Sequence, residues 1–137
     1  QPLDNALVNC TALTHLGLDF SFNQKDELPS NIKSLRLNCN NRFYTEHLPD
    51  SIEEIELGWD FNLELDNLPS SIKKISFNER SKYNKELNCL PTGLIVLKLP
   101  YKYDKQIYSI PSALTKLVCS ANYQFIKDFA SIEVCTY

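Results

Sequence analysis

The stretch LPDSIEEIEL, residues 48–57, decides the fold, because the same pattern recurs along most of the chain. A Leu-Pro pair is followed by Ile52, Ile55 and Leu57, which stand four, seven and nine positions after the leucine of the pair. Within residues 54–57 polar and apolar side chains alternate with a period of two, as in a short strand with one buried face. Proline cannot donate a backbone hydrogen bond to a sheet, so its place before this segment marks a corner where the strand begins.

Five of the seven prolines stand in a Leu-Pro or Ile-Pro pair that precedes such an apolar triplet, and these pairs are spaced by 20, 20, 22 and 20 residues. An earlier copy near the N-terminus has the apolar triplet without the Leu-Pro pair. The six triplets hold seventeen aliphatic or aromatic residues and one cysteine, in a chain that is 43% hydrophobic, so the repeat is not a coincidence. They are Leu13/Leu16/Leu18, Ile32/Leu35/Leu37, Ile52/Ile55/Leu57, Ile72/Ile75/Phe77, Leu94/Leu97/Leu99 and Leu114/Leu117/Cys119.

One aromatic residue also returns in each repeat, after the triplet. In three of the repeats it is followed directly by asparagine. The aromatic residues are Phe22, Phe43, Phe61, Tyr83, Tyr103 and Tyr123.

Stacked repeats of this kind predict a mainly β, right-handed solenoid whose strands form a parallel sheet on the concave face. A 20-residue coil with one strand and two bends leaves too little chain for a helix with its caps, so we expect little or no helix and at most a 3₁₀ turn. The chain then reads as one repeat domain, residues 1–137, with an N-terminal cap at 1–8. Six repeats follow at 9–27, 28–47, 48–67, 68–89, 90–109 and 110–129, and then a C-terminal cap at 130–137. The alternating run at 131–135 falls outside the repeat frame and is either a capping strand, which we favour, or the start of a truncated seventh repeat.

The L-x-x-L-x-L frame with a period of 20 to 22 residues resembles leucine-rich repeats. Its combination with Phe-Asn and a later Leu-Pro or Ile-Pro is similar to the FNIP repeat family, and the resemblance spans roughly residues 9–123. That family occurs in amoebal and giant-virus proteins, sometimes beside F-box domains. The resemblance implies a recognition role, either as the substrate-recognition part of a ubiquitin-ligase adaptor or in virus–host interaction.

Composition excludes several other functions. A net charge of −3 opposes nucleic-acid binding, and no apolar run approaches the ~20 residues of a membrane span. No catalytic motif, metal-ligand spacing or cofactor motif occurs, so we expect no enzyme, no metal and no cofactor. The five cysteines lie in different registers of the repeat, which predicts no disulfide between neighbouring coils. Unpaired thiols favour a reducing compartment, so we expect a cytoplasmic location, with secretion left open. We also expect the protein to be a monomer.

The repeat frame also identifies the side chains that point away from the core. Their identities vary freely while the core positions stay apolar, which is typical of a solenoid with a variable binding face. Acidic residues gather in the repeat at 48–67 and basic residues in the repeat at 68–89. Charged and aromatic side chains on this face are our candidates for contacts with a protein or peptide partner. They are Phe20, Arg36, Glu54, Glu56, Trp59, Lys74, Lys98 and Tyr101.

A second function remains open from the same residues. The large aromatics stand outside the core triplets on alternate repeats, and aromatic faces also bind sugars. The alternative is therefore a carbohydrate or small-ligand binder that uses this aromatic row.

Overall fold

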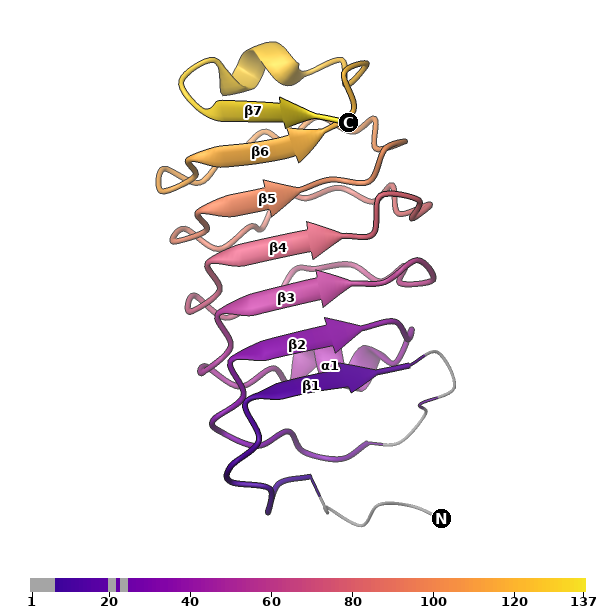
Figure 1. The fold of residues 1–137 in the computed structure, drawn as a ribbon, viewed down its shortest axis with the longest axis vertical. Helices are drawn as coiled ribbons and strands as arrows, with labels where there is room; N and C mark the ends of the chain where they lie inside the picture. The colour runs from indigo at the N-terminus through magenta and orange to yellow at the C-terminus, as the bar shows by residue number, and fades with distance from the viewer. Residues whose placement is uncertain (1–6, 20–21, 23–24) are drawn as a thin grey trace.

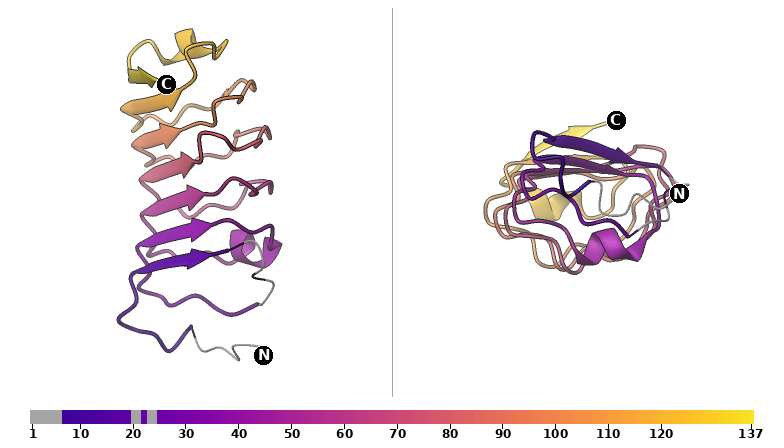
Figure 2. Two further views of the ribbon diagram at one scale, coloured as in Figure 1. Left: turned by 45° about the vertical axis from the view of Figure 1, so that its right-hand side comes forward. Right: turned by 90° about the horizontal axis from the view of Figure 1, so that it is seen from below.

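The computed structural model describes residues 7–19, 22 and 25–137, which form a right-handed solenoid with one parallel sheet (Figure 1). Across the described residues the sheet has seven strands in chain order, and the return segments run behind it (Figure 2). The strands are β1 His15–Leu18, β2 Ser34–Leu37, β3 Glu54–Leu57, β4 Lys74–Phe77, β5 Val96–Lys98, β6 Lys116–Cys119 and β7 Glu133–Thr136. Two short helices complete the secondary structure, α1 at Arg42–Glu46 and the 3₁₀ helix η1 at Ile126–Phe129.

Strand pairing follows the repeat frame residue for residue, which confirms the register predicted from the triplets. Each core residue pairs with its equivalent on the next coil, so one apolar row runs the length of the sheet. That row is Leu16, Leu35, Ile55, Ile75, Leu97, Leu117 and Val134. The outward rows are in register in the same way, and we call the side of the sheet that carries them the open face.

The Leu-Pro corners have a direct role in starting each strand. The proline carbonyl accepts a hydrogen bond from the amide three residues later, as from Ile52 to Pro49 at 3.3 Å and from Leu94 to Pro91 at 3.1 Å. This bond closes a turn and needs no proline N–H, so proline fits the position at no hydrogen-bonding cost. The residue that donates is the first of each core triplet, and it is therefore turned into the core. Ile52 and Leu94 are both fully buried.

Aromatic rings form a second core row on the return side. Tyr44, not Phe43, takes the buried place in its repeat, since Tyr44 is 0% exposed and Phe43 only packs against the core from outside. Both residues belong to α1, which is capped by the Asn41 side chain accepting a hydrogen bond from the amide of Phe43 at 3.2 Å. This five-residue α-helix goes beyond the 3₁₀ turn that we expected at most, although helix content is low, as predicted.

Buried tyrosine hydroxyls tie neighbouring coils together. The Tyr103 hydroxyl donates to the Lys85 carbonyl at 2.9 Å, and the Tyr123 hydroxyl donates to the Lys105 carbonyl at 2.7 Å. Each bond reaches back 18 residues, to the preceding coil. Burial raises the pKa of both phenols well above the ordinary value, because ionisation would place a negative charge inside the core.

At the C-terminal end, the run at 131–135 joins the sheet as β7 and pairs in parallel with all four residues of β6. Thr136 occupies the register position that Cys119 fills on β6 and is exposed. The structure describes no further coil over Thr136, so its polar side chain faces solvent. At the other end Leu7, in the predicted N-terminal cap at 1–8, packs against the core, whereas residues 1–6 lie outside the described residues.

Truncating a mid-stack core residue tests the coil-on-coil core. Leu97→Ala is expected to lower the free energy of unfolding by about 2 to 5 kcal/mol, because it empties a position that is 0% exposed between two other coils. Urea unfolding followed by circular dichroism measures this loss. Ile95→Ala is the control, since Ile95 is 40% exposed on the same coil, and an equal loss for both variants would contradict the assigned core.

The buried hydroxyls of Tyr103 and Tyr123 predict that the folded state becomes less stable at alkaline pH. The folded-state pKa values of Tyr103 and Tyr123 are raised, so their contribution is complete below the unfolded-state pKa of about 10 and is lost as pH rises from there. The urea midpoint is therefore expected to fall from about pH 10 upward, and to fall less steeply in Tyr103→Phe/Tyr123→Phe. Tyr108→Phe, at a residue 74% exposed, should leave the slope unchanged. A double variant with the slope of the native chain would refute the assignment.

Candidate functional site

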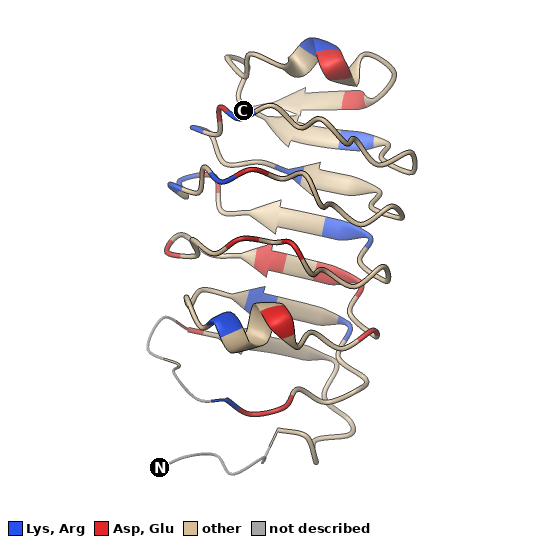
Figure 3. Ribbon diagram, turned by 180° about the vertical axis from the view of Figure 1, so that it is seen from behind, with Lys and Arg blue, Asp and Glu red and all other residues tan. Residues whose placement is uncertain are grey.

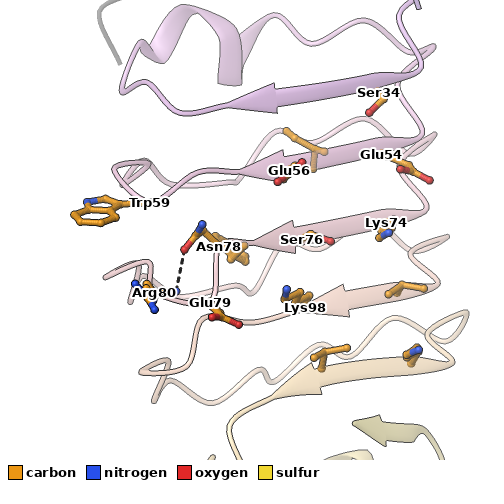
Figure 4. Close-up of a pocket in the computed structure, with 15 residues that line it drawn as sticks. Ser34, Glu54, Glu56, Trp59, Lys74, Ser76, Asn78, Glu79, Arg80 and Lys98 are labelled. Atoms are coloured by element: carbon orange, nitrogen blue, oxygen red, sulfur yellow. Dashed lines mark hydrogen bonds between the residues drawn. The ribbon is translucent and has the colours of Figure 1, made fainter. Parts of the chain in front are cut away.

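The open face holds a hollow of about 880 Å³ that extends over β3, β4, β5 and β6 (Figure 4). We call it the central groove. Its floor and walls come from the outward rows of the sheet and from the loops that leave β3 and β4. The side chains that line it are Ser34, Glu54, Ile55, Glu56, Trp59, Lys74, Ser76, Phe77, Asn78, Glu79, Arg80, Val96, Lys98, Lys116 and Val118.

Five of the eight residues chosen from the sequence meet in this groove. They are Glu54, Glu56, Trp59, Lys74 and Lys98. Arg36 lies beside it on β2, and Tyr101 lies in a neighbouring hollow beyond the end of β5. Phe20 falls outside the described residues, so the structure gives it no place.

Charges in the groove are separated by strand. Both outward side chains of β3 are carboxylates, Glu54 and Glu56, and both are exposed. Figure 3 shows the sign changing along the stack, from acidic β3 to basic residues on β4, β5 and β6. The predicted segregation of charge between repeats is therefore present on the open face itself.

One of the carboxylates already has a partner. Arg36 Nε lies 3.1 Å from Glu56 Oε2, and more than half of each side chain is exposed. Across the next strand pair Glu54 and Lys74 are register partners, yet they form no ion pair among the described residues. Exposed ion pairs are weak, so these charges stay available to an incoming ligand.

An aromatic rim borders the groove at the carboxyl ends of the strands. Trp59 is 57% exposed, Tyr101 49% and Tyr137 40%. Tyr101 and Tyr137 face each other with ring centroids 6.2 Å apart and line a hollow of about 430 Å³ together with Glu79, Arg80, Ser81 and Lys102. Half-exposed rings at the edge of a groove are the side chains that commonly supply binding energy at interfaces.

Tyr137 is held rigidly in this rim. Its hydroxyl donates to the Leu99 carbonyl at 2.9 Å, and its amide donates to the Cys119 carbonyl at 3.2 Å. Lys98 Nζ lies 5.6 Å from the ring centroid, within the range of a cation–π contact. Burial, with a smaller contribution from the nearby Glu79 charge, raises the pKa of Tyr137 to about 12.

A close approach between coils fixes the loop that carries Trp59. At Gly58 a Cβ atom would collide with the side chain of Asn38 on the preceding coil. The Asn38 amide uses that space to accept a hydrogen bond from the Asp60 amide at 3.2 Å. Glycine is therefore required next to Trp59, and the tryptophan is presented by an ordered turn.

Two rim residues, Arg80 and Tyr137, were not among the candidates from the sequence. Arg80 belongs to a turn in which its amide donates to Asn78 Oδ1 at 2.9 Å, a motif that could have been noticed from the Asn after the strand. Tyr137 could have been found by placing 133–136 in the repeat frame, because it then follows the seventh strand directly. The run follows the sixth strand at a spacing of only 17 residues, in place of the 20 to 22 of the repeat, so it lies outside the repeat frame.

Other kinds of site are not formed by the described residues. Within them no three His, Cys, Asp or Glu side chains gather in a way that could hold a metal ion. The two short helices of the described part are far from the length and apolar character of a membrane span.

Comparisons with known proteins agree with this architecture. The sequence model of the FNIP repeat matches residues 22–58 and 40–80. The crystal structure of CroV588, a giant-virus protein described as a novel circular LRR protein, matches with a TM-score of 0.68 and 28% sequence identity. The match covers 81% of this chain and 18% of CroV588, so the chain spans less than a fifth of that protein. No protein with a curated description matches significantly.

Fold, register and comparisons together define a leucine-rich-repeat-like solenoid. Such repeat proteins are generally non-enzymatic scaffolds and commonly mediate protein–protein interaction. Over residues 22–80 its sequence is similar to FNIP repeats, a family of repeats of this kind.

The availability of the β3 carboxylates can be measured by a double-mutant cycle. With Arg36→Gln and Glu56→Gln, the coupling energy is expected to be only about 0.2 to 1 kcal/mol and to vanish at high salt, because both side chains are exposed. The pair Lys33 and Glu53, at 3.2 Å, is a matched comparison off the groove. A coupling well above that range, insensitive to salt, would mean that the pair serves the fold and is closed to ligands.

Proposed function

We propose that the chain is a non-enzymatic recognition module that binds a peptide or protein partner on the open face of its sheet. The observation that carries this proposal is the central groove, where five side chains selected for their position in the repeat converge. None of these five is used in the core. A surface whose residues vary while the layer beneath them stays apolar is free to specialise for binding.

The size of the open face decides the kind of partner. Seven strands leave six gaps of ~4.8 Å, and three outward residues span ~10 Å, which gives a flat footprint on the order of 300 Å². A standard protein interface uses about 800 Å² per partner. An extended peptide, a loop or a single helix therefore suits the groove better than a broad globular surface.

The family supports two biological settings for such binding, both put forward here as part of the proposal. One is the substrate-recognition part of a ubiquitin-ligase adaptor, and the other is contact between a virus and its host. The thiols of Cys39, Cys89, Cys119 and Cys135 are all free, which supports a reducing, cytoplasmic location. We take the module to act as a monomer, because the groove is complete within one chain.

A carbohydrate or small-ligand binder is the second candidate. It is favoured by the hollow between Tyr101 and Tyr137, whose rings are half exposed, and by the hydrogen bond that holds the Tyr137 hydroxyl on the Leu99 carbonyl. In this case the ligand would stack on the rim and depend little on the charges of β3.

Two variants separate these candidates. In Glu54→Lys/Glu56→Lys the charge of β3 is reversed, and in Trp59→Ala/Tyr101→Ala two of the three rings of the rim are removed. Affinity capture from cells of the source organism, with cross-linking and mass spectrometry, should map a protein partner to the groove and lose it in the first variant. Glycan-array binding that is lost only in the second variant would favour the sugar candidate.

A control variant tests whether the change in net charge alone, away from the groove, affects binding. Glu46→Lys/Glu86→Lys makes the same change of charge at two exposed positions on the return side, opposite the open face (Figure 2). It is expected to bind like the native chain. Cross-links confined to the return side, or loss of the partner in this control alone, would overturn the proposal.

A further inference from the structure

Three lysines surround one valine on the basic side of the central groove. The register partners of Val96 are Lys74 on β4 and Lys116 on β6, and Lys98 is two residues further along the same strand. Neighbouring strands are ~4.8 Å apart, so the three stems start within one small area of the sheet. Val96 and the half-buried Val118 form an apolar floor between them.

No ion pair is formed by Lys74, Lys98 or Lys116 within the described part of the chain. Lys98 contacts the Tyr137 ring, which leaves its charge unneutralised. Three like charges in one hollow repel each other, and this repulsion is relieved when an anionic ligand binds.

β3 lines the other side of the same groove and carries the opposite charge. Glu54 and Glu56 are both exposed, and only Glu56 has a cationic partner among the described residues. Along the long axis of the solenoid the groove therefore begins with carboxylates on β3 and continues with ammonium groups on β4, β5 and β6 (Figures 3 and 4).

The distance between strands and the order of their charges together predict the order of charges in a peptide ligand. An extended peptide places inward side chains every ~6.7 Å, at residues i, i+2 and i+4. With residue i above β3, residue i+2 lies between β4 and β5, and residue i+4 lies near β6, which is ~14 Å from β3. Opposite charges match when residue i is basic and the other two are acidic.

We propose that the ligand of the central groove is an extended protein segment lying along the solenoid axis, with the pattern basic-x-acidic-x-acidic in either chain direction. This inference rests on the proposed function and adds the chemistry of the partner. The basic residue lies on Glu54 and Glu56. The acidic residues lie among Lys74, Lys98 and Lys116, over the valine floor.

Synthetic peptides with blocked ends test the pattern directly. One carries Lys-Ser-Asp-Ser-Asp between Gly-Ser flanks, and its control, Asp-Ser-Lys-Ser-Asp, has the same composition with the basic residue in the centre. Fluorescence anisotropy at low ionic strength is expected to show about tenfold tighter binding of the first peptide, because the control places its ammonium group against Lys98. Raised salt should remove the difference.

Reversing the charges of β3 should change which peptide the protein binds more tightly. Glu54→Lys/Glu56→Lys makes all the charged side chains on the strands that line the groove basic and leaves Glu79 in the loop after β4, so this variant is expected to prefer Asp-Ser-Asp-Ser-Asp over the bipolar peptide. Lys74→Glu/Lys116→Glu should lose the bipolar peptide, whereas Glu46→Lys/Glu86→Lys should bind it as the native chain does. Circular dichroism of each variant checks that it folds, and these positions are all on the surface.

Three results would overturn the inference: equal affinity for the two peptides of the same composition, no binding of either, or an unchanged preference in the β3 variant. The proposed function has a separate outcome. If a captured partner cross-links to the open face through a segment without the bipolar pattern, recognition on this face stands and the inferred ligand chemistry is wrong. If the cross-links lie elsewhere, the proposed function is wrong whatever the peptides do.

Discussion

Hydrogen bonding between equivalent residues of successive coils is the constraint on which the rest of the structure depends. A coil of about 20 residues cannot bury its own apolar side chains, so each coil is stable only when another covers it in the same register. The parallel ladder sets that register, and a shift of one residue would turn a core side chain such as Ile55 outward and Glu56 inward. Core rows, aromatic rows and the charges of the open face all follow from this single alignment.

The same alignment explains how much could be predicted from the sequence. Buried positions recur with the period of the coil, so the strands, their pairing and the outward rows could all be derived by counting from the Leu-Pro pairs. The places where prediction fell short are those where the period breaks. Tyr44, and not the Phe43 of the aromatic pattern, is the buried ring of its repeat, within the helix α1. The last strand follows the sixth at a spacing of only 17 residues, so the outward rows counted from the sequence did not reach Tyr137.

For the site, the sequence identified which side chains point outward but not which of them meet. Glu54, Glu56, Lys74 and Lys98 come from three strands, and their meeting in one groove follows from the register. The rim was harder to foresee, because loop residues such as Arg80 and Tyr137 lie outside the periodic part of each coil. Their positions depend on individual contacts, such as the hydrogen bond from the Tyr137 hydroxyl to Leu99, which no repeat pattern encodes.

The orientation of the strands also governs how the domain responds to force. The strands run across the long axis, so the hydrogen bonds between coils point along it (Figure 1). Tension applied to the two ends of the solenoid first loads the hydrogen bonds of the outermost strand pair. These bonds break one after another, so the whole sheet is not sheared at once. The coils would peel away singly at low force, and a tethered chain of this kind would behave as a soft, extensible spacer that stacks again when released.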